Sequence, residues 1–170
     1  WADYNWEKQD SQLLQVTNQP YYYIRPEISS LAQLKKTGIH IIRGPRQVGK
    51  TTLLKEIIST VFNSGALSPD RVLYLSCETL ENYSALENAI GSWLKDNAGI
   101  GAVFLDEVSF VKEWPRAILA FSNRGWLREK SVFITGSNAR DLKESGERLP
   151  GRRGSGEDIR LFPFGLKELR

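Results

Sequence analysis

Hydrophobic positions along the chain fall into two alternating patterns that differ in period. Short, nearly continuous apolar runs rich in β-branched residues predict five strands, at residues 39–43, 71–77, 102–108, 131–137 and 159–164. Apolar residues at helical spacing predict helices between them, at residues 29–38, 51–62, 83–99 and 114–127, with a further helix starting at 164–170. Residues 1–26 are aromatic and show neither period.

The alternation of strands and helices predicts an α/β fold. Apolar runs without polar interruptions are typical of strands covered on both faces, so we expect a parallel five-stranded sheet in a three-layer α/β/α sandwich. We assign residues 38–170 to this core and residues 1–37 to an N-terminal extension that packs on it; stacking of its aromatics on an adenine base is the alternative. The last predicted helix lacks a closing glycine or proline, so we expect the natural protein to continue.

The composition fits one globular domain: 170 residues, 41% apolar and 25% charged. The net charge is +3, and the sequence has no concentrated basic block of the kind found in dedicated nucleic-acid binders. We therefore interpret the excess of positive charge as an ordinary surface with spare arginines. Cys77 is the only cysteine, which excludes an intrachain disulfide and fits a reducing cytoplasm. The sequence has no membrane-length apolar run, no signal peptide and no methionine, so we expect a cytoplasmic chain that is processed or a fragment.

A loop of fixed pattern joins the first predicted strand to the helix after it. It fits the phosphate-loop pattern G-x-x-x-x-G-K-[ST] and reads Gly44-Pro45-Arg46-Gln47-Val48-Gly49-Lys50-Thr51. Glycines let the backbone wrap around phosphate, and N–H groups at the helix N-terminus attract the anion. We expect Lys50 to reach the β- and γ-phosphates, Thr51 to ligate Mg²⁺ and Thr52 to contact the α-phosphate. A glycine-rich turn with a surface lysine is the alternative.

Two acidic residues, Asp106 and Glu107, follow the apolar part of the third predicted strand. Ligands of open α/β sheets bind at the carboxyl edge of the strands. We expect Asp106 to hold Mg²⁺ in its outer shell and Glu107 to accept a proton from the attacking water, from opposite sides of the strand. A solvated acidic pair is the alternative. The glutamate after the aspartate, with a strand between the two motif strands, predicts a P-loop NTPase fold with strand order 5-1-4-3-2.

Polar residues also end the fourth predicted strand, whose tip faces the γ-phosphate in this topology. Ser137 and Asn138 are both candidates to orient the water or to sense phosphate loss, and a helix N-cap is the alternative. A glycine-rich, charged loop then carries arginines at positions 148, 152 and 153, and Arg160 follows it. Arginine can stabilise charge on a transferring phosphoryl group, in cis or from a neighbouring subunit. A solvated loop is an equally good interpretation.

Four further residues invite a functional interpretation, and for three of them packing or a surface position is the alternative. His40, inside the first predicted strand, is expected to be packed rather than catalytic. Trp114 and Arg116 follow the acidic strand and can carry conformational change away from the site, although helix packing is the better interpretation of Trp114. Glu78 follows the second predicted strand, where a role in the site and a surface position are both open.

Several segments together are more specific than the phosphate loop alone: GPRQVGKTTLL, FLDEVSFVKEW, VFITGSNARDL, RLPGRRG and LFPFGLKEL, in this order. Over residues 38–170 the chain resembles a family of bacterial and archaeal AAA-superfamily ATPases. The resemblance implies a C-terminal domain after the ATPase core, and it implies functional roles at the motif positions Lys50, Thr51, Asp106, Glu107, Ser137 and Arg152. Where the family more often has serine, this chain has Gly165.

These features predict ATP binding and slow, Mg²⁺-dependent hydrolysis of ATP to ADP and phosphate. We expect hydrolysis to be coupled to a conformational switch that controls an appended domain or a protein partner. The alternatives are a regulatory module with negligible turnover and a DNA-dependent ATPase, to which the unclustered basic residues lend weak support. Adenine rather than guanine follows from the resemblance, and no guanine-reading Asn/Thr-Lys-x-Asp motif is present. A homo-oligomer that supplies an arginine in trans stays open.

Overall fold

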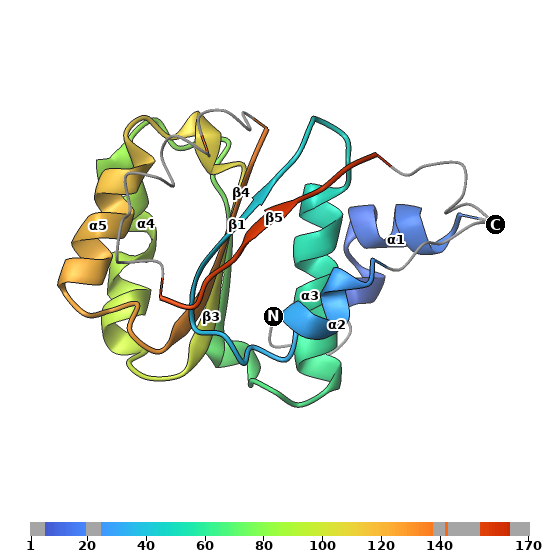
Figure 1. Ribbon diagram of the computed structural model, residues 1–170, viewed down its shortest axis with the longest axis horizontal. Helices are drawn as coiled ribbons and strands as arrows, with labels where there is room; N and C mark the ends of the chain where they lie inside the picture. The colour runs from blue at the N-terminus through green and yellow to red at the C-terminus, as the bar shows by residue number, and fades with distance from the viewer. Residues whose placement is uncertain (1–5, 20–24, 138–141, 143–153, 164–170) are drawn as a thin grey trace.

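The computed structural model describes residues 6–19, 25–137, 142 and 154–163. These residues contain a five-stranded sheet (Figure 1) built from β1 (Gly38–Arg43), β2 (Val72–Ser76), β3 (Gly101–Asp106), β4 (Lys130–Gly136) and β5 (Asp158–Arg160). The strand pairings are parallel, in the order β2-β3-β4-β1-β5. Read from the other edge this order is 5-1-4-3-2, so the predicted fold class and sheet topology are confirmed.

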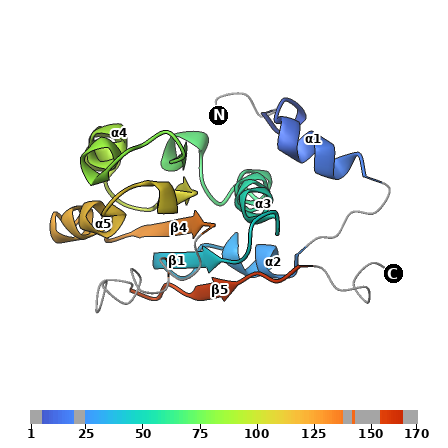
Figure 2. The same ribbon diagram turned by 90° about the horizontal axis from the view of Figure 1, so that it is seen from above.

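Helices cover both faces of the sheet and form the outer layers of the sandwich (Figures 1 and 2). One side carries α1 (Ser11–Thr17), α2 (Glu27–Leu31) and α3 (Lys50–Asn63), and the other carries α4 (Tyr83–Asp96) and α5 (Trp114–Asn123). Short 3-10 turns complete the described elements: η1 (Trp6–Lys8), η2 (Pro69–Arg71) and η3 (Val108–Phe110). None of the described helices has the length and apolar character needed to cross a membrane.

The two-residue period of the strands divides the core between the two helical layers. In β3, Val103 and Leu105 pack with the residues of α4 and α5, whereas Phe104 packs with those of α2 and α3. The side chains of β3 and β4 are buried on both faces of the sheet. This burial explains why both strands are continuous apolar runs in the sequence.

The N-terminal extension is more regular than predicted. Residues 11–17 form helix α1 inside the segment that we predicted to be irregular. Asp10 starts this helix, because its Oδ1 accepts hydrogen bonds from the backbone N–H groups of Gln12 and Leu13, at 3.1 and 3.0 Å. The capping signal was therefore present in the sequence, but the short helix showed no clear apolar period.

The helix predicted at residues 29–38 is wrong in both of its boundaries. Helix α2 ends at Leu31, and Gly38 begins β1 instead of closing a helix. Leu34 lies in a turn with φ of 52° and packs against the core formed by α2 and α3. The spacing of Leu31 and Leu34 resembles a helical period because both side chains pack in the core formed by α2 and α3. Other predicted elements are shortened: α5 ends at Asn123 and β5 at Arg160.

Candidate nucleotide-binding site

The loop between β1 and α3 adopts backbone conformations that wrap it around a small volume. Gln47 and Gly49 have positive φ values of 62° and 86°. Gly44 must be glycine, because a Cβ there would lie 2.7 Å from the backbone oxygen of Leu161. Left-handed residues in a turn bring neighbouring N–H groups to one concave side, which favours an anion. Helix α3 begins at Lys50, so its N-terminal N–H groups lie at the same place.

The loop sequence explains its exposure pattern. Pro45, Arg46 and Gln47 form the exposed tip, while Val48 is buried against the core formed by α2 and α3. Thr51 and Thr52 are half-buried in the first turn of α3. The predicted phosphate-binding residues thus form the β1–α3 connection and the first turn of α3.

Lys50 is central to the candidate site. Its side chain is only 3% exposed, and its ammonium donates hydrogen bonds to the backbone oxygens of Gly44, at 3.2 Å, and Pro45, at 2.9 Å. Its Nζ also lies 3.8 Å from Oε1 of Glu107. A buried cation held by two neutral carbonyl oxygens and one carboxylate can exchange these contacts for phosphate oxygens, which carry more charge.

The two acidic residues lie at the carboxyl end of β3 but do not alternate as strand residues. Asp106 is the last residue of β3 and is buried, whereas Glu107 has φ of 52° and begins a turn. Our expectation that the two carboxylates point to opposite sides of a strand therefore does not apply. The Glu107 carboxylate instead faces Lys50 and accepts the backbone N–H of Ser137 at 2.8 Å.

Thr135 and Tyr74 hold the Asp106 carboxylate, and sequence reasoning missed both. The Thr135 hydroxyl donates to Oδ1 of Asp106 and accepts the Glu107 N–H at 3.1 Å, while the Tyr74 hydroxyl donates to Oδ2 at 3.0 Å. Burial and the neighbouring Asp106 charge raise the pKa of Tyr74, so its hydroxyl remains a donor. The signal for Thr135 was a polar residue inside an apolar strand.

Cys77, the single cysteine, is also buried next to the acidic pair. Cys77 follows β2 and is fully buried, and its backbone N–H donates to the Asp106 oxygen of the main chain at 2.8 Å. Burial, followed by the charge of Asp106, raises the pKa of the Cys77 thiol to about 12. The thiol is therefore neutral beside the acidic pair and adds no charge to the site.

Several candidates from the sequence lie outside the described residues or have no described contact with Lys50, Asp106 or Glu107. Asn138, Arg148, Arg152 and Arg153 lie outside the described residues. Arg160 is at the end of β5, with its guanidinium 5.0 Å from the Phe162 ring centre. Glu78 is exposed. Of the two sensor candidates, Ser137 is therefore the one that the structure describes beside Glu107.

The packing interpretation of Trp114 is supported by its contacts, whereas Arg116 lies at the surface. Trp114 is 2% exposed and belongs to the core beneath α4 and α5. Arg116 is exposed, with its guanidinium paired to Glu113 at 2.9 Å and 4.3 Å from the ring centre of Tyr83. Trp114 therefore belongs to the core on the α4–α5 side of the sheet.

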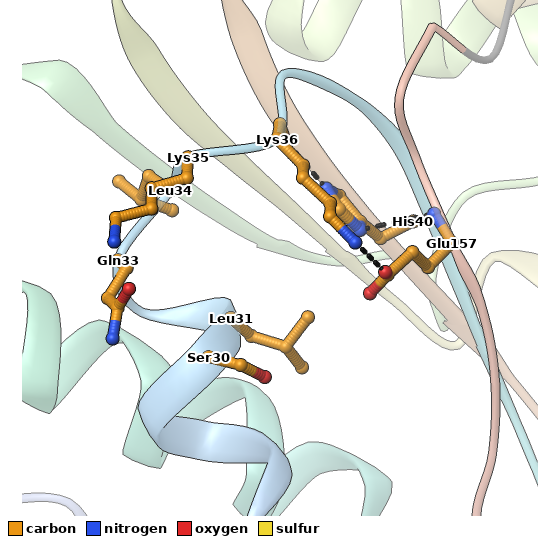
Figure 3. Close-up of a pocket in the computed structure, with 8 residues that line it drawn as sticks. All are labelled: Ser30, Leu31, Gln33, Leu34, Lys35, Lys36, His40 and Glu157. Atoms are coloured by element: carbon orange, nitrogen blue, oxygen red, sulfur yellow. Dashed lines mark hydrogen bonds and ion pairs between the residues drawn. The ribbon is translucent and has the colours of Figure 1, made fainter.

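A separate cavity of about 200 Å³ lies near the start of β1, away from the phosphate loop (Figure 3). His40, which lines it, is packed as predicted: its ring stacks on Phe133 with centroids 4.8 Å apart. One ring nitrogen lies 2.9 Å from the Lys36 backbone oxygen, and the other accepts the Glu157 N–H at 3.3 Å. The Lys36 ammonium pairs with the Glu157 carboxylate. These polar groups bind one another, so the cavity does not compete with the phosphate loop as the candidate site.

The donor set at the β1–α3 connection fits a nucleotide with Mg²⁺. The N–H groups and Lys50 suit phosphate, and the Thr51 hydroxyl with the Asp106 carboxylate suits a hard cation that keeps several of its waters. Among the described residues, no three His, Cys, Asp or Glu side chains cluster as a metal cage. A magnesium ion shared with phosphate needs no such cage.

The strand order and the loop between β1 and α3 define a P-loop NTPase. A family model described as an AAA domain matches residues 36–170, and the chain belongs to this family. It is therefore an AAA-type P-loop ATPase domain. A search of curated proteins found no match.

Solved structures resemble the fold at low sequence identity. Cdc6p from Pyrobaculum aerophilum matches with a TM-score of 0.55 and 15% identity, over 88% of this chain and 49% of that chain. The Aeropyrum pernix ORC1 protein, in complex with DNA, matches with a TM-score of 0.57 and 18% identity, over 85% and 46%. The Thermotoga maritima RuvB Holliday junction branch migration motor matches with a TM-score of 0.55 and 14% identity, over 86% and 48%. The chain thus spans about half the length of these proteins.

Proposed function

We propose that this domain binds ATP and ADP with Mg²⁺ at the β1–α3 loop and hydrolyses ATP slowly. The observation that carries the proposal is the position of Lys50, whose buried ammonium lies 3.8 Å from the Glu107 carboxylate and against the loop carbonyls. A phosphate-binding cation and a carboxylate that can accept a proton from water then lie within one site. Both are needed for phosphoryl transfer to water.

The proposed roles follow from where each group lies. Backbone N–H groups of residues 46–52 and the Lys50 ammonium bind the phosphates. Thr51 and Asp106 hold Mg²⁺, which when bound neutralises charge on the β- and γ-phosphate oxygens. Glu107 accepts the proton of the attacking water. Ser137, whose N–H donates to the Glu107 carboxylate, senses whether the γ-phosphate is present.

The contacts of Glu107 also support coupling to a switch. Its carboxylate is engaged by Lys50 and by the Ser137 amide, which follows β4 directly. A triphosphate competes with Glu107 for the Lys50 ammonium. Its binding therefore weakens the contact between Lys50 and Glu107 and changes the hydrogen bond between Glu107 and the Ser137 N–H. We propose that this rearrangement passes through the chain after β4 to an appended domain or a protein partner. Turnover then resets the state.

Two substitutions test the proposal, with calorimetry for binding and phosphate release for turnover. Lys50→Ala should abolish measurable ATP binding, whereas Lys95→Ala, at an exposed position on α4, should bind like the wild type. Glu107→Gln should keep ATP binding and lower turnover at least about 10²-fold. Glu113→Gln is the matched control, because Glu113 is an exposed residue of the connection between β3 and α5 that also contains Glu107.

The outcomes separate the candidate functions. Wild-type turnover in Glu107→Gln would remove the assigned role of that residue. ATP binding without turnover in the wild type would instead identify a regulatory module. Turnover that rises with added duplex DNA would identify a DNA-dependent ATPase. ATP binding that survives Lys50→Ala would contradict the proposed site itself.

A further inference from the structure

An arginine from the N-terminal segment contacts the phosphate loop. We use the name N-terminal segment for the described residues 6–19 and 25–35, all of which lie before the match to the AAA family model. Nη2 of Arg25 donates a hydrogen bond of 2.8 Å to the backbone oxygen of Val48. Arg25 is 8% exposed and Val48 is 6% exposed, so this charged hydrogen bond is formed away from solvent. Buried bonds of this kind are stronger than those on a surface.

The bond constrains the amide next to it. The described chain has no cis peptide bond, so the peptide between Val48 and Gly49 is trans. In a planar trans peptide, the carbonyl of one residue and the N–H of the next point in opposite directions. Anchoring the Val48 oxygen on Arg25 therefore turns the Gly49 N–H away from Arg25. Arg25 lies two residues before α2, which packs on α3 in the core. A Cβ at Gly49 would meet no other atom within 4 Å, so the space beside Gly49 is open.

We propose that Arg25 is a positioning residue for nucleotide phosphate. It holds the Val48–Gly49 peptide so that the Gly49 N–H faces the phosphates, and its positive charge behind the peptide strengthens the attraction for a polyanion. This inference rests on the proposed function. It also makes the N-terminal segment a part of the nucleotide site, although that segment precedes the matched family domain.

Contacts with α3 hold the N-terminal segment before and after Arg25, and after it they are made by the buried Ile28 and Leu31 of α2. Oδ2 of Asp10 lies 2.5 Å from the Lys55 ammonium, and the side chains of both residues are at most 20% exposed. The Ser59 hydroxyl donates to the Glu7 carboxylate at 2.6 Å. Both contacts attach the segment to α3, the helix that the phosphate loop starts. Arg25 thus links the N-terminal segment to the phosphate loop, and both of these parts are attached to α3.

The test compares Arg25→Gln and Arg25→Lys with Arg128→Gln, an exposed arginine far from the loop in the sequence. The full-length protein is titrated with MgADP and with pyrophosphate, and its KM and kcat for ATP are measured. Arg25→Gln should raise the Kd for both ligands and the KM about tenfold, while kcat stays within about twofold. An amide that binds phosphate equally in the ground and transition states changes KM rather than kcat. Arg25→Lys should restore part of the affinity, and Arg128→Gln should behave as wild type.

Each other outcome overturns the inference. Unchanged Kd and KM in Arg25→Gln, or a fall in kcat at constant KM, shows that Arg25 does not position the phosphates. If Arg25→Gln does not fold, Arg25→Lys decides by the same criterion, since it retains the charge. A wild-type protein that binds neither MgADP nor pyrophosphate would remove the proposed function as well. A wild-type protein that binds both, with variants that bind equally, removes this inference alone.

Discussion

Thr135→Val removes the hydroxyl that joins the two acidic residues. Thr135 is fully buried, and its hydroxyl donates to Asp106 and accepts the Glu107 N–H at 3.1 Å. Valine has nearly the same volume, so the change removes hydrogen bonds without opening a large cavity. A neutral hydrogen bond contributes about 1 kcal/mol and one to a charged group about 1.5–3 kcal/mol, so their loss should lower the free energy of unfolding by about 2.5–4 kcal/mol. The Tyr74 hydroxyl, 3.0 Å from the other Asp106 oxygen, remains and favours the lower end of this range.

Urea unfolding followed by tryptophan fluorescence measures this loss. Thr135→Ser keeps the hydroxyl and should cost only about 1 kcal/mol for the lost methyl group. Combining Thr135→Val with Tyr74→Phe should give a non-additive result, because both hydroxyls hold the same carboxylate. A Thr135→Val protein within about 0.5 kcal/mol of the wild type would refute the reasoning, because an unsatisfied buried Asp106 oxygen should cost more than that. Turnover should also fall, since Asp106 and Glu107 lose their common support.

Further predictions concern the thiol and the glycine of the loop. Because burial and then the Asp106 charge raise the pKa of Cys77 from 9.0 to about 12, the folded protein should resist iodoacetamide near pH 8 and react only on unfolding. The folded state keeps a proton that the unfolded state loses, so the free energy of unfolding should fall as pH rises from 9.0 toward about 12; a flat profile there would contradict this. Gly44→Ala should lower stability by about 1–3 kcal/mol, because its Cβ would lie 2.7 Å from the Leu161 oxygen. Gly91→Ala, inside α4 with contacts no closer than 3.8 Å, should instead keep or raise stability.

The architecture was largely predictable because its signals are local. Continuous apolar runs predicted all five strands, and the phosphate-loop pattern predicted the turn from β1 into α3. The glutamate at position 107 and the strand between the motif strands predicted the sheet order. The predictions failed where a short segment owes its structure to packing. Leu34 imitates a helical period from within a turn, and α1 depends on its Asp10 cap and its contacts with α3.

The candidate site was predictable only for residues that carry a motif. Lys50, Asp106 and Glu107 stand at positions where chemistry demands a particular residue type. Tyr74 lies in no motif, and Thr135 lies in the VFITGSNARDL segment without a role assigned from it. Their hydroxyls reach Asp106 from β4 and β2 on either side of β3. Arg25 lies in the aromatic extension, where nothing along the chain pairs it with Val48.

The sequence by itself determined the α/β class, the phosphate loop and the acidic strand end, because backbone preference and hydrophobic period act over a few neighbouring residues. The tertiary structure alone decided which side chains hold these groups in place. The register that sets Leu105 beside Ile134 brings Thr135 to Asp106, and the packing of the N-terminal segment on α3 brings Arg25 to the loop. Such contacts join residues far apart in the chain, and they exist only once strand register and helix packing have been chosen together.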